Sequence, residues 1–205
     1  TTGAGSAIAN QQGTLNVARS SFFENEAVDG TIYNSASATA VIRASSFYSN
    51  TAMRGGGLYN AGNGTVVVEN NSFAYNHVSE GGGVLNHGVM TATHNTFAYN
   101  SATFGRAIYN SGSMALFNNL VGQNSGGGAD CHNQGTLTAS SGNLIQDGGC
   151  NATITGDSGV GALGDYGGET LSLALIPTST AIDQADAFGC LPDDQQGISR
   201  PQVSG

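Results

Sequence analysis

Lysine is missing from this chain of 205 residues, and its five basic residues are all arginines. Charged residues make up only 9% of the sequence, and the net charge is −9. Because a nucleic-acid partner calls for a basic surface, this balance excludes nucleic-acid binding as an expected function. No apolar run approaches the ~18 residues of a membrane-spanning helix, so no membrane span is expected.

The few charges are unevenly distributed along the chain. Residues 1–126 hold five acids and four arginines, a net charge of −1, whereas residues 127–205 hold nine acids and one arginine, a net charge of −8. This asymmetry predicts two segments with different roles. We expect coils over residues 1–160 and an acidic extension over residues 161–205 that packs on the coils or caps them. No signal-peptide pattern is seen, and we interpret the chain as a mature fragment or part of a longer protein.

The sequence is rich in glycine and asparagine, and it repeats. Short motifs such as "GGGLYN" and "GGGVLN" recur with spacings of 24, 26, 26, 24 and 23 residues between their final asparagines, which are Asn10, Asn34, Asn60, Asn86, Asn110 and Asn133. A second motif, such as "FAYN", places a phenylalanine three residues before each of Asn25, Asn50, Asn76 and Asn100. A period in the twenties is typical of a solenoid and argues against disorder.

Short alternating stretches such as "TVVVE" lie between the motifs and predict strands rather than helices. We therefore predict an all-β, right-handed parallel β-helix with three strands in each coil of about 24 residues. One inward row holds an aliphatic residue or cysteine, namely Ile8, Ile32, Leu58, Val84, Ile108 and Cys131. The alternating strands contribute a row from Leu15 to Leu137 and a row from Val17 to Ala139. Phenylalanines 22, 47, 73 and 97 form an aromatic stack, and Leu120 and Leu144 take their place in later coils.

The recurring asparagines are expected to lie at strand ends and to form amide ladders between coils, because identical amides at one-coil spacing can bond to one another. A row of amides that binds a ligand remains the alternative. Two opposite-charge pairs, Arg43 with Glu69 and Arg54 with Glu80, should be neighbours in adjacent coils. Exposed pairs of this kind contribute ~0–1 kcal/mol each.

The motifs resemble the polymorphic outer-membrane protein repeats of bacterial surfaces, whose signature pairs GGA-I/L/V with FxxN. The stretch "LGDYGGETLSLALIPTSTAIDQADAFGCLPDDQQGISRPQ" at residues 163–202 resembles the C-terminal part of bacterial secreted β-helix proteins of the choice-of-anchor Q type. These resemblances imply export, a right-handed parallel β-helix and a place at the cell surface. They imply no catalytic residues. The family's "CDIGA" ending, which would offer Cys190 a partner, is missing.

The three cysteines, Cys131, Cys150 and Cys190, lie toward the C-terminal end of the chain. Cys131 replaces an inward aliphatic residue, and Cys150 follows one strand and one turn later, so we predict a Cys131–Cys150 disulfide that leaves Cys190 over.

Candidate catalytic or metal-binding residues are sparse. The acids of the coils are scattered, and His77, His87, His94 and His132 are expected at the surface or in turns, with His94 on an alternating strand. Calcium is the one cofactor considered, held by the C-terminal acids Asp157, Asp165, Asp183, Asp186, Asp193 and Asp194, but no known calcium-loop pattern is present. No catalytic residue, cofactor or metal site is therefore predicted.

These observations favour a non-catalytic structural or adhesive protein, extracellular or on the cell surface. Its expected partners are further copies of itself, joined head to tail into a fibre, or surface glycans and proteins. The alternatives are a polysaccharide lyase or hydrolase, or a glycan-binding module, because parallel β-helices also host such functions.

Overall fold

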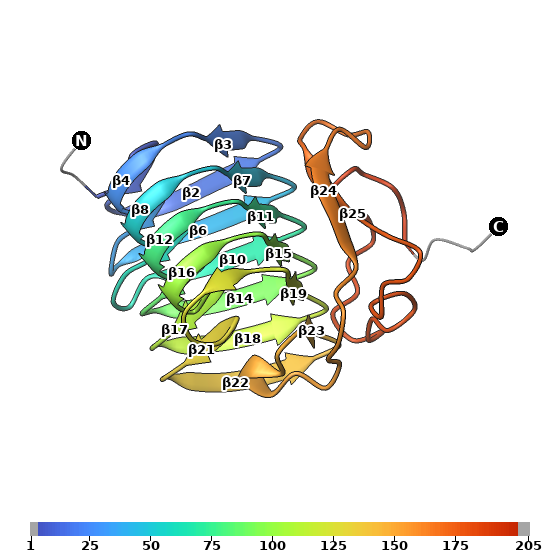
Figure 1. Ribbon diagram of the computed structural model, residues 1–205. Coiled ribbons are helices and arrows are strands. Elements are labelled where there is room, and N and C mark those ends of the chain that lie inside the picture. The colour runs from blue at the N-terminus through green and yellow to red at the C-terminus, as the bar shows by residue number, and fades with distance from the viewer. Residues whose placement is uncertain (1–3, 201–205) are drawn as a thin grey trace.

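The computed structural model describes residues 4–200 and is a parallel β-solenoid of stacked coils, in which each coil is one turn of the chain (Figure 1). Its sheets run along the stack, with one strand from each coil. One sheet contains the aliphatic-x-Asn motifs, as β1 (Ile8–Asn10), β5 (Ile32–Asn34), β9 (Leu58–Asn60), β13 (Val84–Asn86), β17 (Ile108–Asn110) and β21 (Cys131–Asn133). The next contains the alternating stretches, as β2 (Gly13–Ala18), β6 (Ala38–Arg43), β10 (Thr65–Glu69), β14 (Val89–Thr93), β18 (Ser113–Phe117) and β22 (Thr136–Ser141).

Two further sheets complete the coils. The phenylalanine motif forms β3 (Ser21–Phe23), β7 (Ser46–Tyr48), β11 (Ser72–Ala74), β15 (Thr96–Ala98), β19 (Leu120–Gly122) and β23 (Leu144–Ile145). The last sheet contains β4 (Glu26–Asp29), β8 (Thr51–Arg54), β12 (His77–Glu80), β16 (Ser101–Phe104) and β20 (Ser125–Gly126). The all-β parallel fold is confirmed, but the expected number of three strands in each coil is wrong. The right-handed sense stays a prediction.

The fourth strand was missed because its sequences, such as "HVSE", are short and mix polar residues with a single inward apolar one. Ala52, Val78 and Ala102 are the buried apolar residues of these strands, and with the partly buried Ala27 they form a small cluster of their own. A strand of this kind has too few alternating positions to be recognised from periodicity.

The main core consists of stacked rows of like residues. Ile32, Leu58, Val84 and Ile108 are each fully buried, and the strands pair Leu58 directly with Val84, as predicted. The four phenylalanine rings stack with centroids 4.8 Å apart and interplanar angles of 6–9°. Consecutive coils are therefore rotated very little relative to one another, which is unusual for β-sheets and is typical of sheets held by side-chain ladders.

Three expected positions in the later coils, Leu120, Leu144 and Ala139, are wrong by one residue. Val121 and Ile145 continue the phenylalanine row, not Leu120 and Leu144. In β22 a bulge lies between the partners of Met114 and Ala115, so Ser140 rather than Ala139 pairs with Leu116. A β-bulge adds one residue to a strand and moves the following side chains to the other face of the sheet. Counting residues along the sequence repeat cannot detect such a bulge.

The tight corners use left-handed backbone at residues other than the marker asparagines. Corner residues with positive φ include Arg19, Ala44, His94 and Tyr75. The asparagines of the two predicted rows are not among the positive-φ residues described. Left-handed conformations at non-glycine residues cost ~1–2 kcal/mol each, so the surrounding hydrogen bonds must stabilise them.

The two ends of the stack differ. At the last coil the chain turns into the 3-10 turn η1 (Gly149–Asn151), where Cys150 and Ala152 pack against the main core. At the first coil, Ile8, Leu15 and Phe22 also pack against the core but are only partly buried. The C-terminal end of the core is thus covered, and the N-terminal end is more open among residues 4–200.

The acidic C-terminal segment, called the arm below, runs alongside the stack (Figure 1). It contains an antiparallel pair, β24 (Val160–Gly164) and β25 (Ser172–Leu175). It bonds to corners of widely separated coils, since Thr170 Oγ1 donates to Ala44 O and Asn118 Nδ2 donates to Asp186 O. The limits expected at residues 1 and 205, and the motif residues Pro201 and Gln202, lie outside the described residues. No helix among the described residues is long and apolar enough to cross a membrane.

The stacking of Phe97 gives a test of the core. A Cβ added at Gly83 would lie 2.5 Å from Phe97 Cδ1, whereas Ala107 fills the equivalent place in the next coil, where Val121 replaces the phenylalanine. We expect Gly83→Ala to lower the free energy of unfolding by about 1–3 kcal/mol through overpacking. In a Phe97→Val background the same change should cost much less. Urea denaturation of the four proteins measures the difference, and an equal cost in both backgrounds would contradict the packing described.

Candidate functional site

The first predicted asparagine row forms a continuous chain of amide hydrogen bonds. Each Nδ2 donates to the Oδ1 of the asparagine in the following coil, at distances from 2.6 to 3.0 Å over Asn10, Asn34, Asn60, Asn86, Asn110 and Asn133. Most of these nitrogens also donate to a backbone carbonyl, as Asn60 Nδ2 does to Gly64 O. The middle members of the row are fully buried, so their amides are not available to a ligand.

The second predicted row behaves in the same way. Asn25, Asn50, Asn76 and Asn100 are joined Nδ2 to Oδ1, and the row continues to Asn124. Each oxygen from Asn50 onward also accepts the backbone N–H of the asparagine in the preceding coil. These bonds anchor the residue that follows each left-handed corner.

A third ladder was missed from the sequence. Asn71, Asn95, Asn119 and Asn143 are bonded Nδ2 to Oδ1 at 2.9–3.0 Å and are fully or almost fully buried. The signal that could have found it is an asparagine two residues before each inward phenylalanine or aliphatic residue, as in "NSF" and "NTF".

Cys131 and Cys150 form the disulfide that the sequence predicted, with Cα atoms 5.6 Å apart. It joins β21 to the turn that covers the end of the core. Cys190 is a free and exposed cysteine in the arm.

A charged cluster that sequence reasoning missed lies next to this disulfide. Arg106 Nε is 3.2 Å from Asp130 Oδ1, and Arg106 Nη2 is 2.7 Å from Asp147 Oδ2. Asp147 Oδ2 also accepts the backbone N–H of Asp130, and its Oδ1 accepts the N–H of Gly149. The three side chains line a polar cavity of about 330 Å³ together with Gln123, Asn124 and Gln146.

Asp130 is 2% exposed and occupies a position that holds Gly57, Gly83 and Ala107 in earlier coils. A carboxylate in a row of small inward residues is a signal that could have been read from the sequence. Burial raises the pKa of Asp130 to about 6, with Arg106 opposing the shift and Asp147 adding to it. The cluster therefore contains a carboxyl group that can be protonated near neutral pH.

The expected charge pairs are neighbours in adjacent coils, with one change of partner. Arg43 pairs with Glu69 in register, and its Nε forms an ion pair with that carboxylate. Arg54 is in register with Glu80, but its ion pair is with Asp29 of the preceding coil, at 2.6 Å. Arg54 also lies over the ring of Tyr59, 5.4 Å from its centroid.

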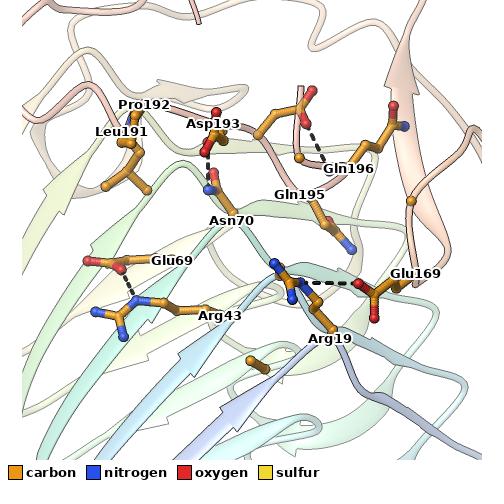
Figure 2. Close-up of a pocket in the computed structure, with 15 residues that line it drawn as sticks. Arg19, Arg43, Glu69, Asn70, Glu169, Leu191, Pro192, Asp193, Gln195 and Gln196 are labelled. Carbon is orange, nitrogen blue, oxygen red and sulfur yellow. Dashed lines mark hydrogen bonds and ion pairs between the residues drawn. The ribbon is translucent and has the colours of Figure 1, made fainter. Parts of the chain in front are cut away.

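A cleft with a volume of about 480 Å³ lies between the coil corners and the arm (Figure 2). Arg19 forms an ion pair with Glu169 of the arm at 3.3 Å. Asn70 Nδ2 donates to Asp193 O, and Arg43 faces Glu69 (Figure 2). The lining contains two arginines and the four acids Glu69, Glu169, Asp193 and Asp194, a net charge of −2. Each arginine of the cleft already forms an ion pair with a carboxylate. The cleft therefore suits an uncharged polar ligand better than an anionic one.

Three histidines contact neighbours at the surface of the stack or beside the arm. His94 lies in a corner after β14, not on an alternating strand as expected, and its pKa is lowered to about 4 by burial and by Arg200. His87 Nδ1 is 3.1 Å from Tyr59 Oη, and burial lowers the pKa of His87. The ring of His132 lies 5.1 Å from that of Tyr109.

No group of three or more His, Cys, Asp or Glu side chains within residues 4–200 is arranged to hold a metal ion. Two acids of the arm make local hydrogen bonds: Asp186 accepts the N–H of Phe188, and Asp165 accepts that of Gly167.

Comparison of the chain with protein-family models, with curated proteins and with solved structures gave no match. The structure thus defines the class, a parallel β-solenoid with an arm on its side, and the resemblance to bacterial surface repeats stays a prediction.

The buried ladders can be tested at Asn86. Its amide donates to Asn110 Oδ1 and accepts from Asn60 Nδ2, so Asn86→Ala would remove the bond that Asn110 Oδ1 accepts and one of the bonds that the buried Asn60 amide donates. We expect a loss of about 2–4 kcal/mol in the free energy of unfolding. Asn63→Ala, in an exposed turn, is the matched control and should change it by less than ~0.5 kcal/mol. A loss at Asn86 as small as that of the control would show that the ladder does not stabilise the fold.

Asp130 predicts a pH dependence of stability. Its pKa rises to about 6 in the folded chain. In the unfolded chain it has its ordinary value of about 4. Protonation therefore favours folding, and this contribution, complete below the unfolded pKa, is lost as the pH rises through the folded pKa. Asp130→Asn should remove this contribution.

The measurement is the thermal midpoint at several pH values across that window, for the wild type and for Asp130→Asn. The wild type should lose more stability than the variant as the pH rises. Asp183→Asn, an exposed acid of the arm, serves as the control and should keep the wild-type slope. Parallel slopes for the wild type and Asp130→Asn would contradict the assignment.

Proposed function

We propose that this chain belongs to a non-catalytic protein, extracellular or on the cell surface, in which the solenoid acts as a rigid structural or adhesive rod. The observation that carries the proposal is the use of the polar side chains inside the coils. Three ladders of buried amides bond coil to coil and are closed to ligands. Because these polar groups bond to one another, they stabilise the stack and do not form a reactive site. This use of the interior supports a stiff protein with a repeated outer surface.

The proposed location rests on the disulfide and on the sequence resemblance. A disulfide such as Cys131–Cys150 is typical of an oxidising compartment outside the cytosol. The polymorphic outer-membrane protein repeats and the choice-of-anchor Q proteins, which the motifs resemble, are bacterial surface and secreted proteins. We therefore propose the same location for this chain.

The proposed partners are surface glycans or proteins, or further solenoid coils. The cleft beside Arg19, Glu169 and Asp193 offers paired charges and backbone groups to a polar ligand. Head-to-tail association of intact copies would have to displace the turn that holds Cys150 and Ala152 over the last coil. The first coil is thus the better candidate for contact with another coil.

A polysaccharide-processing enzyme is the second candidate, and the Arg106 cluster is the observation that favours it. Two carboxylates beside a polar cavity, one with its pKa raised to about 6, fit general acid–base chemistry. Against this, Arg106 contacts both carboxylates, and Asp147 accepts two backbone N–H groups. These contacts indicate that the cluster stabilises the last part of the stack. We therefore favour the structural or adhesive role over the enzyme.

Activity assays with soluble acidic glycans, such as pectin and alginate, separate the two candidates. We expect the wild type to generate no new reducing ends and no unsaturated products. Immobilised protein should instead retain glycan-coated or cell-surface particles, and Asp130→Asn should retain them equally well. Turnover that is lost in Asp130→Asn would establish the enzyme, and a lack of retention on every surface tested would contradict an adhesive role.

A further inference from the structure

One side of the solenoid carries a regular array of small hydroxyl and aliphatic side chains. It is the outer face of the sheet that contains β6, β10, β14 and β18, whose strands are paired in register. Every second side chain of a strand points outward. In each of these four coils, two successive outward positions combine one hydroxyl residue with one aliphatic residue. The eight residues, called the hydroxyl face below, are Thr39 with Val41, Thr65 with Val67, Val89 with Thr91, and Ser113 with Ala115.

The four hydroxyl groups of this face are available to bind water. Among residues 4–200, none of them forms a hydrogen bond within the protein. Thr65 and Val89 are exposed, and the other six side chains are half-buried. Because threonine and valine are stiff at χ1, their hydroxyl and methyl groups hold fixed positions before any contact is made.

The outer faces of the other sheets differ from the hydroxyl face. The arm lies beside the sheet of β7, β11 and β15, where Ser72 Oγ donates to Gln195 Oε1 (Figure 1). The sheet of β5, β9 and β17 carries tyrosines at its outward positions. The sheet of β8 and β12 carries Met53 and His77. The eight positions of the hydroxyl face contain neither a charged nor an aromatic side chain.

The rows of the hydroxyl face run straight along the stack. The inward phenylalanine rings are 4.8 Å apart with interplanar angles of 6–9°, so successive coils are displaced by one strand spacing and hardly rotated. Water molecules joined by O–H···O bonds of ~2.75 Å at the tetrahedral angle have second neighbours ~4.5 Å apart. The two repeats differ by ~0.3 Å per coil, so four successive positions stay within ~1 Å of a row of the ice lattice.

We infer that the hydroxyl face binds ice. Its hydroxyl groups donate to and accept from water molecules at the surface of the crystal. The methyl groups of the valines and threonines lie between these water molecules and restrict them to lattice positions. Charged groups would hold water in shells around themselves instead. The nearest charges, Arg43 and Glu69, lie at the next outward position of their strands and pair with each other.

The shape and chemistry of the face favour ice over other occupants. Sites for small ligands are concave and lined largely by apolar and aromatic side chains, whereas this face is flat and has no aromatic ring. A second copy of the chain would need a more apolar surface, since the cores of homodimer interfaces are depleted in polar groups. Burying four hydroxyl groups without partners would also cost ~1–3 kcal/mol each. An ordered water surface offers each of them a partner.

A single ice crystal grown in a solution of the full chain is the probe. We expect the crystal to become faceted and its freezing temperature to fall below its melting temperature, by a gap that widens with protein concentration. Thr65→Lys should abolish both effects, because the ammonium group keeps its own hydration shell on the face. Thr103→Lys, which changes an exposed threonine of β16 in another sheet, is the matched control and should keep the wild-type gap.

A second variant of the hydroxyl face, Val89→Lys, should also lose both effects, and it keeps the test valid if Thr65→Lys does not fold. The thermal midpoint of each variant shows whether it is folded. Absence of faceting and of a gap with the wild type would overturn the inference. An equal loss in Thr103→Lys, or a wild-type gap in folded Thr65→Lys and Val89→Lys, would also overturn it.

Sedimentation of the wild type tests the rival occupant. A dimer that Thr65→Lys dissociates would show that a second copy covers the hydroxyl face, and this result would overturn the inference. A monomer that facets ice supports it. The inference goes beyond the proposed structural or adhesive role, and its failure would leave the retention of glycan-coated particles to be judged by its own assay.

Discussion

The amide-to-amide hydrogen bond between equivalent asparagines of adjacent coils is the interaction on which the rest of the structure depends. It requires the same residue at the same place in every coil, and it holds successive coils at one spacing and in one register. Asn60, for example, is linked through its side chain to Asn34 on one side and Asn86 on the other. Once this register is set, the aliphatic and aromatic rows must also stack on themselves, as the parallel phenylalanine rings do.

The ladders also explain how the chain can make sharp corners with residues that disfavour them. Tyr75 and Tyr99 have positive φ and immediately precede Asn76 and Asn100, whose amides are bonded to both neighbouring coils. The strain of the corner is offset by bonds made at the next residue. A solenoid built this way gains stability by repetition, since each coil contacts only its neighbours.

The ends and sides of the stack are where the repetition stops and where distinctive chemistry is found. In the last two coils the phenylalanine row gives way to Val121 and Ile145, and the smaller side chains coincide with a buried carboxylate, Asp130, and its arginine. Along the side, the arm bonds to corners of several coils and forms the cleft of Figure 2. Within residues 4–200, the two predicted ladders begin at Asn10 and Asn25 of the first coil. The interior repeats the same contacts from coil to coil, and the side chains that depart from the repeat lie at the boundaries.

Much of this protein was determined by its sequence alone, because stacking turns a sequence period directly into spatial contact. The period predicted the parallel β-solenoid, the inward row through Leu58 and Val84, the neighbouring charges of Arg43 and Glu69, and the Cys131–Cys150 disulfide. Features that break the period could only be decided by the tertiary structure. The bulge in β22 displaces Ala139, and the ion pair of Arg54 goes to Asp29 rather than Glu80, since both acids flank it in register. The arm brings together residues more than a hundred positions apart in the sequence, such as Asn70 and Asp193. The arm does not share the period of the coils, so no local sequence pattern predicts its contacts with them.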